Sequence, residues 1–119
     1  MKRSVLIQPI SLHALVESNR RRAERHATQM EALTRPVDAN DTLWWGATVQ
    51  DISSTGIGIR LCFPFKPGTY LAMDLKAPEG LNRTILSRVV HVRDQADGTW
   101  QLGCEFVKAL NDDELQTLI

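Results

Sequence analysis

Cysteine is scarce in this sequence, which holds only Cys62 and Cys104 among its 119 residues. Neither cysteine belongs to a CxxC pair, and no histidine stands at metal-ligand spacing from either one. This argues against a disulfide scaffold and against a zinc site, so we expect no metal and no cofactor. Both cysteines have apolar neighbours, and we expect them to be buried free thiols in a reducing compartment.

Net charge and long apolar runs are absent as well. Lysine and arginine together number 14, as do aspartate and glutamate, which argues against an extended basic surface for DNA or RNA. The N-terminus resembles a signal peptide only faintly, because Gln8, Pro9 and His13 interrupt its apolar run and no cleavage site follows. No stretch approaches the length of a membrane-spanning helix. We therefore expect a cytoplasmic protein without membrane insertion and without a DNA or RNA partner.

Groups arranged for catalysis are also lacking. The sequence shows no acid–base pair and no metal-ligating cluster at a recognisable spacing. His91 and Cys104 would supply a base and a nucleophile, but no acid or oxyanion hole accompanies them, and a cysteine within an expected strand is more often a core residue. We expect a protein that is not an enzyme.

What the sequence does contain is a series of short segments with the alternation typical of β-strands. Residues 27–33 fit either a weak strand, with Thr28, Met30 and Ala32 on one face, or a helical continuation. Residues 35–41 and 65–68 carry turn formers. A helix is expected from Asn111, a capping residue followed by acids. Clear strands are expected at 43–50, 56–61, 70–75, 83–92 and 100–107.

Five or six short strands with one terminal helix predict a mostly β protein, a small antiparallel barrel. A chain of 119 residues fits one domain. We expect residues 1–19 to form an N-terminal leader that can include a short helix, and residues 20–119 to form the barrel domain with its C-terminal helix.

Arginine is concentrated in one place, with four arginines between Arg20 and Arg25. Arg21 and Arg25 fall on one face of either a helix or a strand, because they stand four residues apart. The planar guanidinium group binds phosphate oxygens in a bidentate manner and stacks on bases. Taken alone, the cluster fits a solvated basic turn better, with Arg20 and Glu24 as a helical ion pair.

The segment from Asp51 to Gly56, which reads Asp-Ile-Ser-Ser-Thr-Gly, lies between two expected strands. It fits a structural turn, in which Asp and Ser bond nearby amides and Gly supplies a permissive dihedral angle. It also fits a base-binding site. There the Asp51 carboxylate accepts hydrogen bonds from N1–H and the exocyclic amine of guanine, Ser53 adds a hydroxyl bond, and Gly56 lets the ligand approach the backbone.

The two motifs in this order, RxxxR from Arg21 to Arg25 and then [D/N]xSxxG from Asp51 to Gly56, resemble those of the PilZ domain family. The resemblance covers residues 20–107 and includes the closing strand at 102–106. It implies a six-stranded antiparallel barrel that binds cyclic di-GMP, with the arginine segment as a loop that folds over the ligand. The ligand-binding residues would be Arg20, Arg21, Arg25, Asp51, Ser53 and Gly56.

The expected function is that of a cyclic di-GMP-binding regulatory or adaptor module in bacterial second-messenger signalling. Ligand binding would change the conformation of the N-terminal arm and signal to an effector protein, which the sequence does not identify. The resemblance also implies, through Arg20, that the ligand binds as an intercalated dimer. Two alternatives stay open: a degenerate PilZ-like protein-interaction module, and a small barrel that binds single-stranded nucleic acid.

Overall fold

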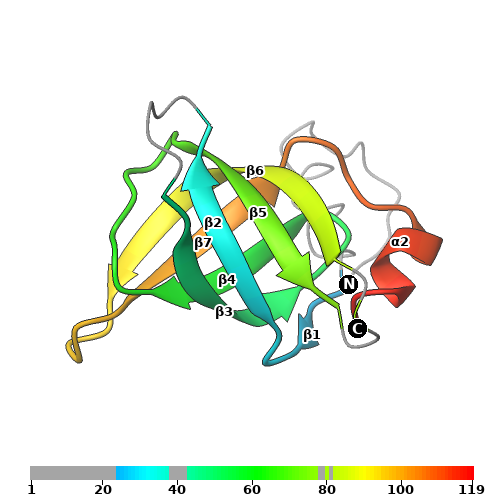
Figure 1. Cartoon of the computed structure of the whole chain (residues 1–119), viewed down its shortest axis with the longest axis horizontal. Helices are drawn as coiled ribbons and strands as arrows, with labels where there is room; N and C mark the ends of the chain where they lie inside the picture. Colours follow the sequence, from blue (N-terminus) through cyan, green and yellow to red (C-terminus); the bar gives the residue numbers. More distant parts are fainter. Residues whose placement is uncertain (1–23, 38–42, 78–79, 81) are drawn as a thin grey trace, which may run out of the picture.

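The structure is a computed structural model that describes residues 24–37, 43–77, 80 and 82–119 (Figure 1). The expected leader, together with Arg20 and Arg21, lies outside the described residues. The elements in chain order are β1 (His26–Ala27), β2 (Glu31–Pro36), β3 (Trp45–Ile52), β4 (Gly56–Leu61), β5 (Tyr70–Lys76), β6 (Asn82–Asp94), β7 (Trp100–Phe106) and α2 (Asp112–Gln116).

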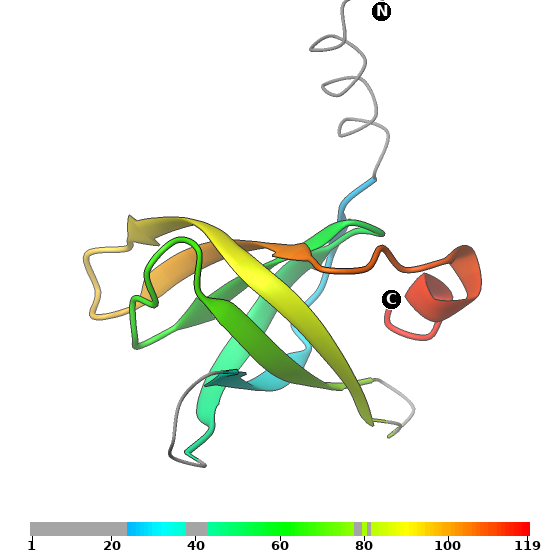
Figure 2. The same ribbon diagram turned by 90° about the horizontal axis from the view of Figure 1, so that it is seen from above.

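Strands β2 to β7 form a closed antiparallel barrel. The sheet runs in the order β1-β3-β2-β5-β6-β7-β4, and an additional pairing of β3 with β4 closes the ring (Figures 1 and 2). Strands β1 and β2 both pair with β3, β1 at residues 51–52 and β2 at residues 45–48. The six-stranded antiparallel barrel expected from the sequence is confirmed.

Alternating apolar side chains fill the interior of the barrel. In β4, Ile57, Ile59 and Leu61 point inward and Arg60 outward, as the sequence pattern predicts. Each such buried aliphatic side chain stabilises the fold by about 1.5–3 kcal/mol. The fully buried side chains include Val49, Ile52, Ile57, Ile59, Leu71, Met73, Leu75, Val89, Leu102 and Leu118.

The C-terminal helix α2 covers one end of the barrel (Figure 1). It begins as predicted with Asn111 as the N-cap, in a capping box in which Asn111 and Glu114 each bond the other's backbone N–H. Such a cap stabilises a helix by about 0.5–2 kcal/mol. The segment before the helix is tied to the β3–β4 turn, since the N–H of Leu110 donates to the carbonyl of Ser54 at 2.7 Å. Within the described residues, no helix is long and apolar enough to cross a membrane.

Two segments predicted as turns are shorter than expected, because strand pairing overrides local turn propensity. Arg35 and Pro36 belong to β2, not to a loop, since they pair with Ala72 and Leu71 of β5. Strand β3 continues through Asp51 and Ile52, because β1 pairs with these two residues. Asp51 is therefore a strand residue, and only residues 53–55 form the turn. The ambiguous segment 27–33 is extended and contributes to β1 and β2.

The expectation that both cysteines are buried is wrong for Cys62. Cys62 follows the last residue of β4 and is exposed, whereas Cys104 points into the barrel. Burial raises the pKa of the Cys104 thiol to about 12, so its reactive thiolate form is rare at neutral pH.

Ellman's reagent is therefore expected to modify one thiol of the native protein quickly and the other only after denaturation. The Cys62→Ser variant should lose the fast reaction. If two thiols of the native protein reacted quickly with the reagent, the burial of Cys104 would be contradicted.

Candidate ligand-binding site

Asp51 reaches the outer surface of the barrel because β3 carries a β-bulge. The register between β3 and β4 shifts between Val49 and Asp51. Gln50 and Asp51 are both half-buried, whereas Val49 and Ile52 on either side are fully buried. Strict alternation from Val49 would turn Asp51 toward the core, and the extra residue of the bulge turns it outward instead.

The guanidinium group of Arg25 forms an ion pair with the carboxylate of Asp51. Arg25 directly precedes β1, and the β1–β3 pairing of Ala27 with Asp51 brings the two side chains together. The side chains are 55% and 28% exposed, respectively, so water screens the pair and its contribution to folding is about 0–1 kcal/mol. The structure thus brings one predicted site residue from each motif into direct contact.

Ser53 and Gly56 have structural roles in the turn beside Asp51. The Ser53 side chain is 1% exposed, and its Oγ accepts hydrogen bonds from the N–H groups of Thr55 and Gly56, each at 3.2 Å. A Cβ atom at Gly56 would lie 2.6 Å from the carbonyl oxygen of Cys104, so the glycine permits close approach of β4 and β7. Ligand contacts by Ser53 and Gly56 stay predictions.

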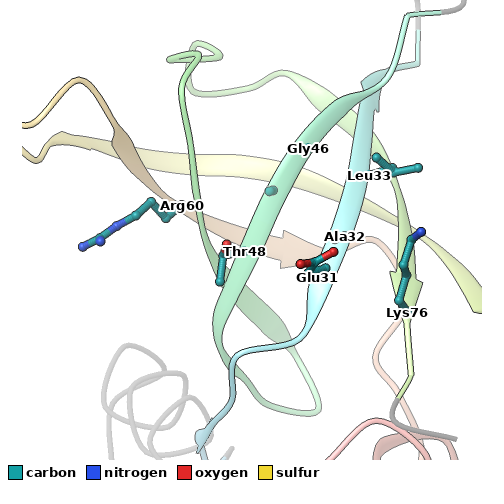
Figure 3. Close-up of a pocket in the computed structure, with 8 residues that line it drawn as sticks. Glu31, Ala32, Leu33, Gly46, Thr48, Arg60 and Lys76 are labelled. Carbon is teal, nitrogen blue, oxygen red and sulfur yellow. The ribbon is translucent and has the colours of Figure 1, made fainter. Parts of the chain in front are cut away.

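Two hollows lie along the outer face of β2 and β3. The larger has a volume of about 630 Å³ and is lined by Ala27, Thr28, Gln29, Glu31, Thr48, Gln50 and Arg60. The smaller, of about 300 Å³, shares Glu31, Thr48 and Arg60 with it. Figure 3 shows Arg60 and Lys76 on opposite sides of the smaller hollow, with Thr48 between them. The larger hollow begins next to Asp51, since Gln50 lines it.

Two residues that line the larger hollow, Gln50 and Arg60, each have a buried polar atom that lacks a hydrogen-bond partner within the described residues, Gln50 Oε1 and Arg60 Nε. Only a terminal nitrogen of Arg60 is engaged, donating to Gln95 Oε1 at 3.4 Å. A buried polar atom without a partner costs about 1–3 kcal/mol, so a side-chain rearrangement that brings these atoms to the polar groups of a ligand would be favoured. Sequence reasoning missed both residues, although the alternation of β4 already placed Arg60 on the outer face.

The described part of the chain supports neither a metal site nor the nucleophile–base pair of His91 and Cys104. No group of three or more His, Cys, Asp or Glu side chains there is arranged to hold a metal ion. His91 and Cys104 point to opposite sides of the barrel wall, since Cys104 is buried and His91 is exposed. The pair therefore does not form the nucleophile–base arrangement considered above.

Comparisons with known proteins identify similar folds. The PilZ domain family matches residues 19–119 of the chain. The PilZ domain of YcgR from Escherichia coli, described with c-di-GMP, aligns with a TM-score of 0.63 and 16% identity over 82% of this chain and 86% of that one. The inhibitor of motility MotI/DgrA from Bacillus subtilis aligns with a TM-score of 0.60 and 18% identity. That alignment covers 79% of this chain and 46% of the Bacillus chain, so this chain spans less than half of its length. A comparison with curated proteins found no match.

Proposed function

Since the chain belongs to the PilZ domain family, a family of non-enzymatic receptors for cyclic di-GMP, we propose that it binds cyclic di-GMP at the Arg25–Asp51 site. The observation that carries this proposal is the ion pair itself. It joins the RxxxR motif to the [D/N]xSxxG motif on the outer face of the barrel, where a ligand has access.

Binding exchanges a weak interaction for stronger ones. The Asp51 carboxylate accepts hydrogen bonds from N1–H and the exocyclic amine of guanine, while Arg25 turns to a phosphate or to the O6 and N7 edge of the base. The exposed ion pair that is lost contributes about 0–1 kcal/mol, whereas each charge-assisted hydrogen bond that forms contributes about 1.5–3 kcal/mol. The exchange of one weak ion pair for stronger hydrogen bonds therefore favours binding.

The larger hollow beside Asp51 would receive the remainder of the ligand. Arg60 offers a guanidinium group to the second phosphate, and the unpartnered Gln50 Oε1 offers an acceptor to a ligand hydroxyl or amine. These two residues supplement the six that the sequence motifs assign.

The remaining parts of the proposal concern the N-terminal region. Arg20 and Arg21 bind the ligand together with Arg25, so that residues 20–25 form a clamp over the bound cyclic di-GMP. Arg20 also allows an intercalated pair of cyclic di-GMP molecules to bind, because its charge offsets the repulsion between their phosphates. Docking of this arm repositions the leader, residues 1–19, and signals to an effector protein in the cytoplasm. The leader and the barrel domain, residues 20–119, thus have separate roles.

Calorimetric titration with cyclic di-GMP tests the proposal. The parent protein is expected to bind with saturation near two ligands per chain. Arg25→Ala is expected to raise the dissociation constant about tenfold, because one charge-assisted bond is lost, with little change in thermal stability. The matched control is Arg35→Ala, which removes the same charge near the C-terminal end of β2, where the Arg35 guanidinium lies over the Trp44 ring.

Absence of binding by the parent protein would refute the proposed function. Equal binding by Arg25→Ala and the parent would refute the clamp. Saturation at one ligand per chain would refute only the intercalated pair and would leave the rest of the proposal standing.

A further inference from the structure

A row of apolar side chains crosses the outer face of β5 and β6 and continues into the residue that follows β7. Ala72 of β5 pairs with Leu86 of β6. The N–H of Val107 donates to the carbonyl of Leu86 at 3.0 Å, so Val107 extends the row. Leu86 is 41% exposed and Val107 is 56% exposed. We refer to Ala72, Leu86 and Val107 together as the apolar strip.

Polar pairs border the apolar strip on both sides. On one side, Arg88 of β6 and Glu105 of β7 form an ion pair at 3.4 Å. On the other side, Asp74 of β5 pairs with Thr84 of β6. Exposed apolar surface with a polar rim is typical of a surface that another segment or molecule covers.

A groove with a volume of about 270 Å³ lies beside the strip, between β6 and the segment that leads to α2. Leu86 and Val107 line this groove together with Ala109. Arg83 and Glu114 also line it, and their ion pair at 3.1 Å joins the start of β6 to α2 (Figure 1). The strip and the groove thus offer an apolar surface beside walls from two connected parts of the fold.

The leader, residues 1–19, is attached to the barrel close to this groove. Arg25 contacts Asp51, which stands three residues before Ser54. The carbonyl of Ser54 accepts a hydrogen bond from the N–H of Leu110, which lines the groove. Three residues span at most about 11 Å, and the five residues between the leader and Arg25 span up to about 18 Å. The leader can therefore reach the groove.

The sequence of the leader supplies side chains that suit an apolar groove. Leu12, Leu15 and Val16 fall on one face of a helix, because they are spaced by three and four residues. A short amphipathic helix is stable mainly when its apolar face packs against another surface. We propose that in the ligand-free protein this face of the leader docks in the groove and covers the apolar strip. The inference concerns the ligand-free chain and does not rest on the proposed function.

A tethered segment suits this surface better than a second copy of the chain does. A stable interface between two proteins buries about 1,200–2,000 Å² in total, whereas the strip consists of three side chains. A segment on a short tether has an effective concentration of about millimolar, so a small contact is sufficient to hold it. The strip then has a covered and an uncovered state, and anything that favours one of them shifts the position of the leader.

Thermolysin, a protease that cleaves before aliphatic residues, probes the leader in the full chain. Leu86→Ser is expected to speed cleavage within residues 12–16 about fivefold, because the docked state loses apolar contact and the undocked population rises. The matched control is Leu43→Ser before β3, an exposed leucine outside the strip, which should be cleaved at the parental rate. A parental rate in Leu86→Ser, or equal acceleration in Leu43→Ser, would overturn the inference.

Engineered disulfides distinguish the leader from a second copy of the chain. In the Cys62→Ser background, Val107→Cys is combined with Leu12→Cys or with Val16→Cys. Docking should bring at least one pair within the Cα separation of about 4.4–6.8 Å that a disulfide needs, so mild oxidation should link the two cysteines within one chain. Thr99→Cys, at the end of the barrel opposite α2, replaces Val107→Cys as the control and should not be linked (Figure 1). Disulfides between two chains would assign the strip to a second copy and overturn docking of the leader, as would the absence of a disulfide in both pairs.

Discussion

Asp51→Ala is expected to weaken binding of cyclic di-GMP about a hundredfold, because two charge-assisted hydrogen bonds to guanine are lost together. The same substitution should reduce the preference for cyclic di-GMP over cyclic di-AMP, since adenine lacks the matching pair of donors. Folding should change little, because the exposed ion pair with Arg25 contributes about 0–1 kcal/mol. Calorimetric titration with both cyclic dinucleotides, together with thermal unfolding, measures all three effects.

Two variants serve as controls for Asp51→Ala. Asp74→Ala removes a half-buried carboxylate from the outer face of β5, away from the site, and should leave affinity unchanged. Asp51→Asn keeps the shape of the side chain and one acceptor oxygen, and the [D/N]xSxxG motif accepts Asn at this position, so it should lose less affinity and less guanine preference than Asp51→Ala does. If Asp51→Ala discriminates between the two ligands as well as the parent does, the guanine-edge role of Asp51 is wrong.

Much of the fold could be predicted from local patterns. The alternation of Ile57, Ile59 and Leu61 predicts β4 with its inward face, and Asn111 followed by acids predicts the capped helix. These features depend on residues that lie close together in sequence, where periodicity and capping chemistry are informative. The barrel follows from the number and spacing of such strands.

The outward position of Asp51 could not be predicted in the same way. It results from a bulge, and a bulge depends on the residue-by-residue register of β3 against β4, which the local sequence pattern does not specify. The same reason applies to the exposed side chain of His91, because the register between β6 and β7 shifts between Val89 and His91. The motif resemblance selected Asp51 as a ligand-binding residue because it carries family information that periodicity lacks, and that role stays a prediction.

Gly56 shows how the structure separates two explanations that the sequence leaves open. A glycine kept for ligand approach can be replaced by alanine without loss of stability. A glycine kept for strand packing cannot. In the structure, a Cβ atom at Gly56 meets a backbone oxygen of β7, which has no rotamer by which to move away. The pairing of Gly56 with Glu105 fixes this approach, so relief requires β4 and β7 to separate.

Gly56→Ala is therefore expected to lower the free energy of unfolding by about 2 kcal/mol, within the range for overpacked sites, and the thermal midpoint by roughly 10 °C. The matched control is Gly46→Ala in β3, where a Cβ atom would have no neighbour within 4 Å. That variant should be neutral or stabilised by about 0.4–1 kcal/mol, because alanine reduces the conformational freedom of the unfolded chain. Urea denaturation followed by circular dichroism measures both. Equal stability of the two variants would contradict the packing role of Gly56.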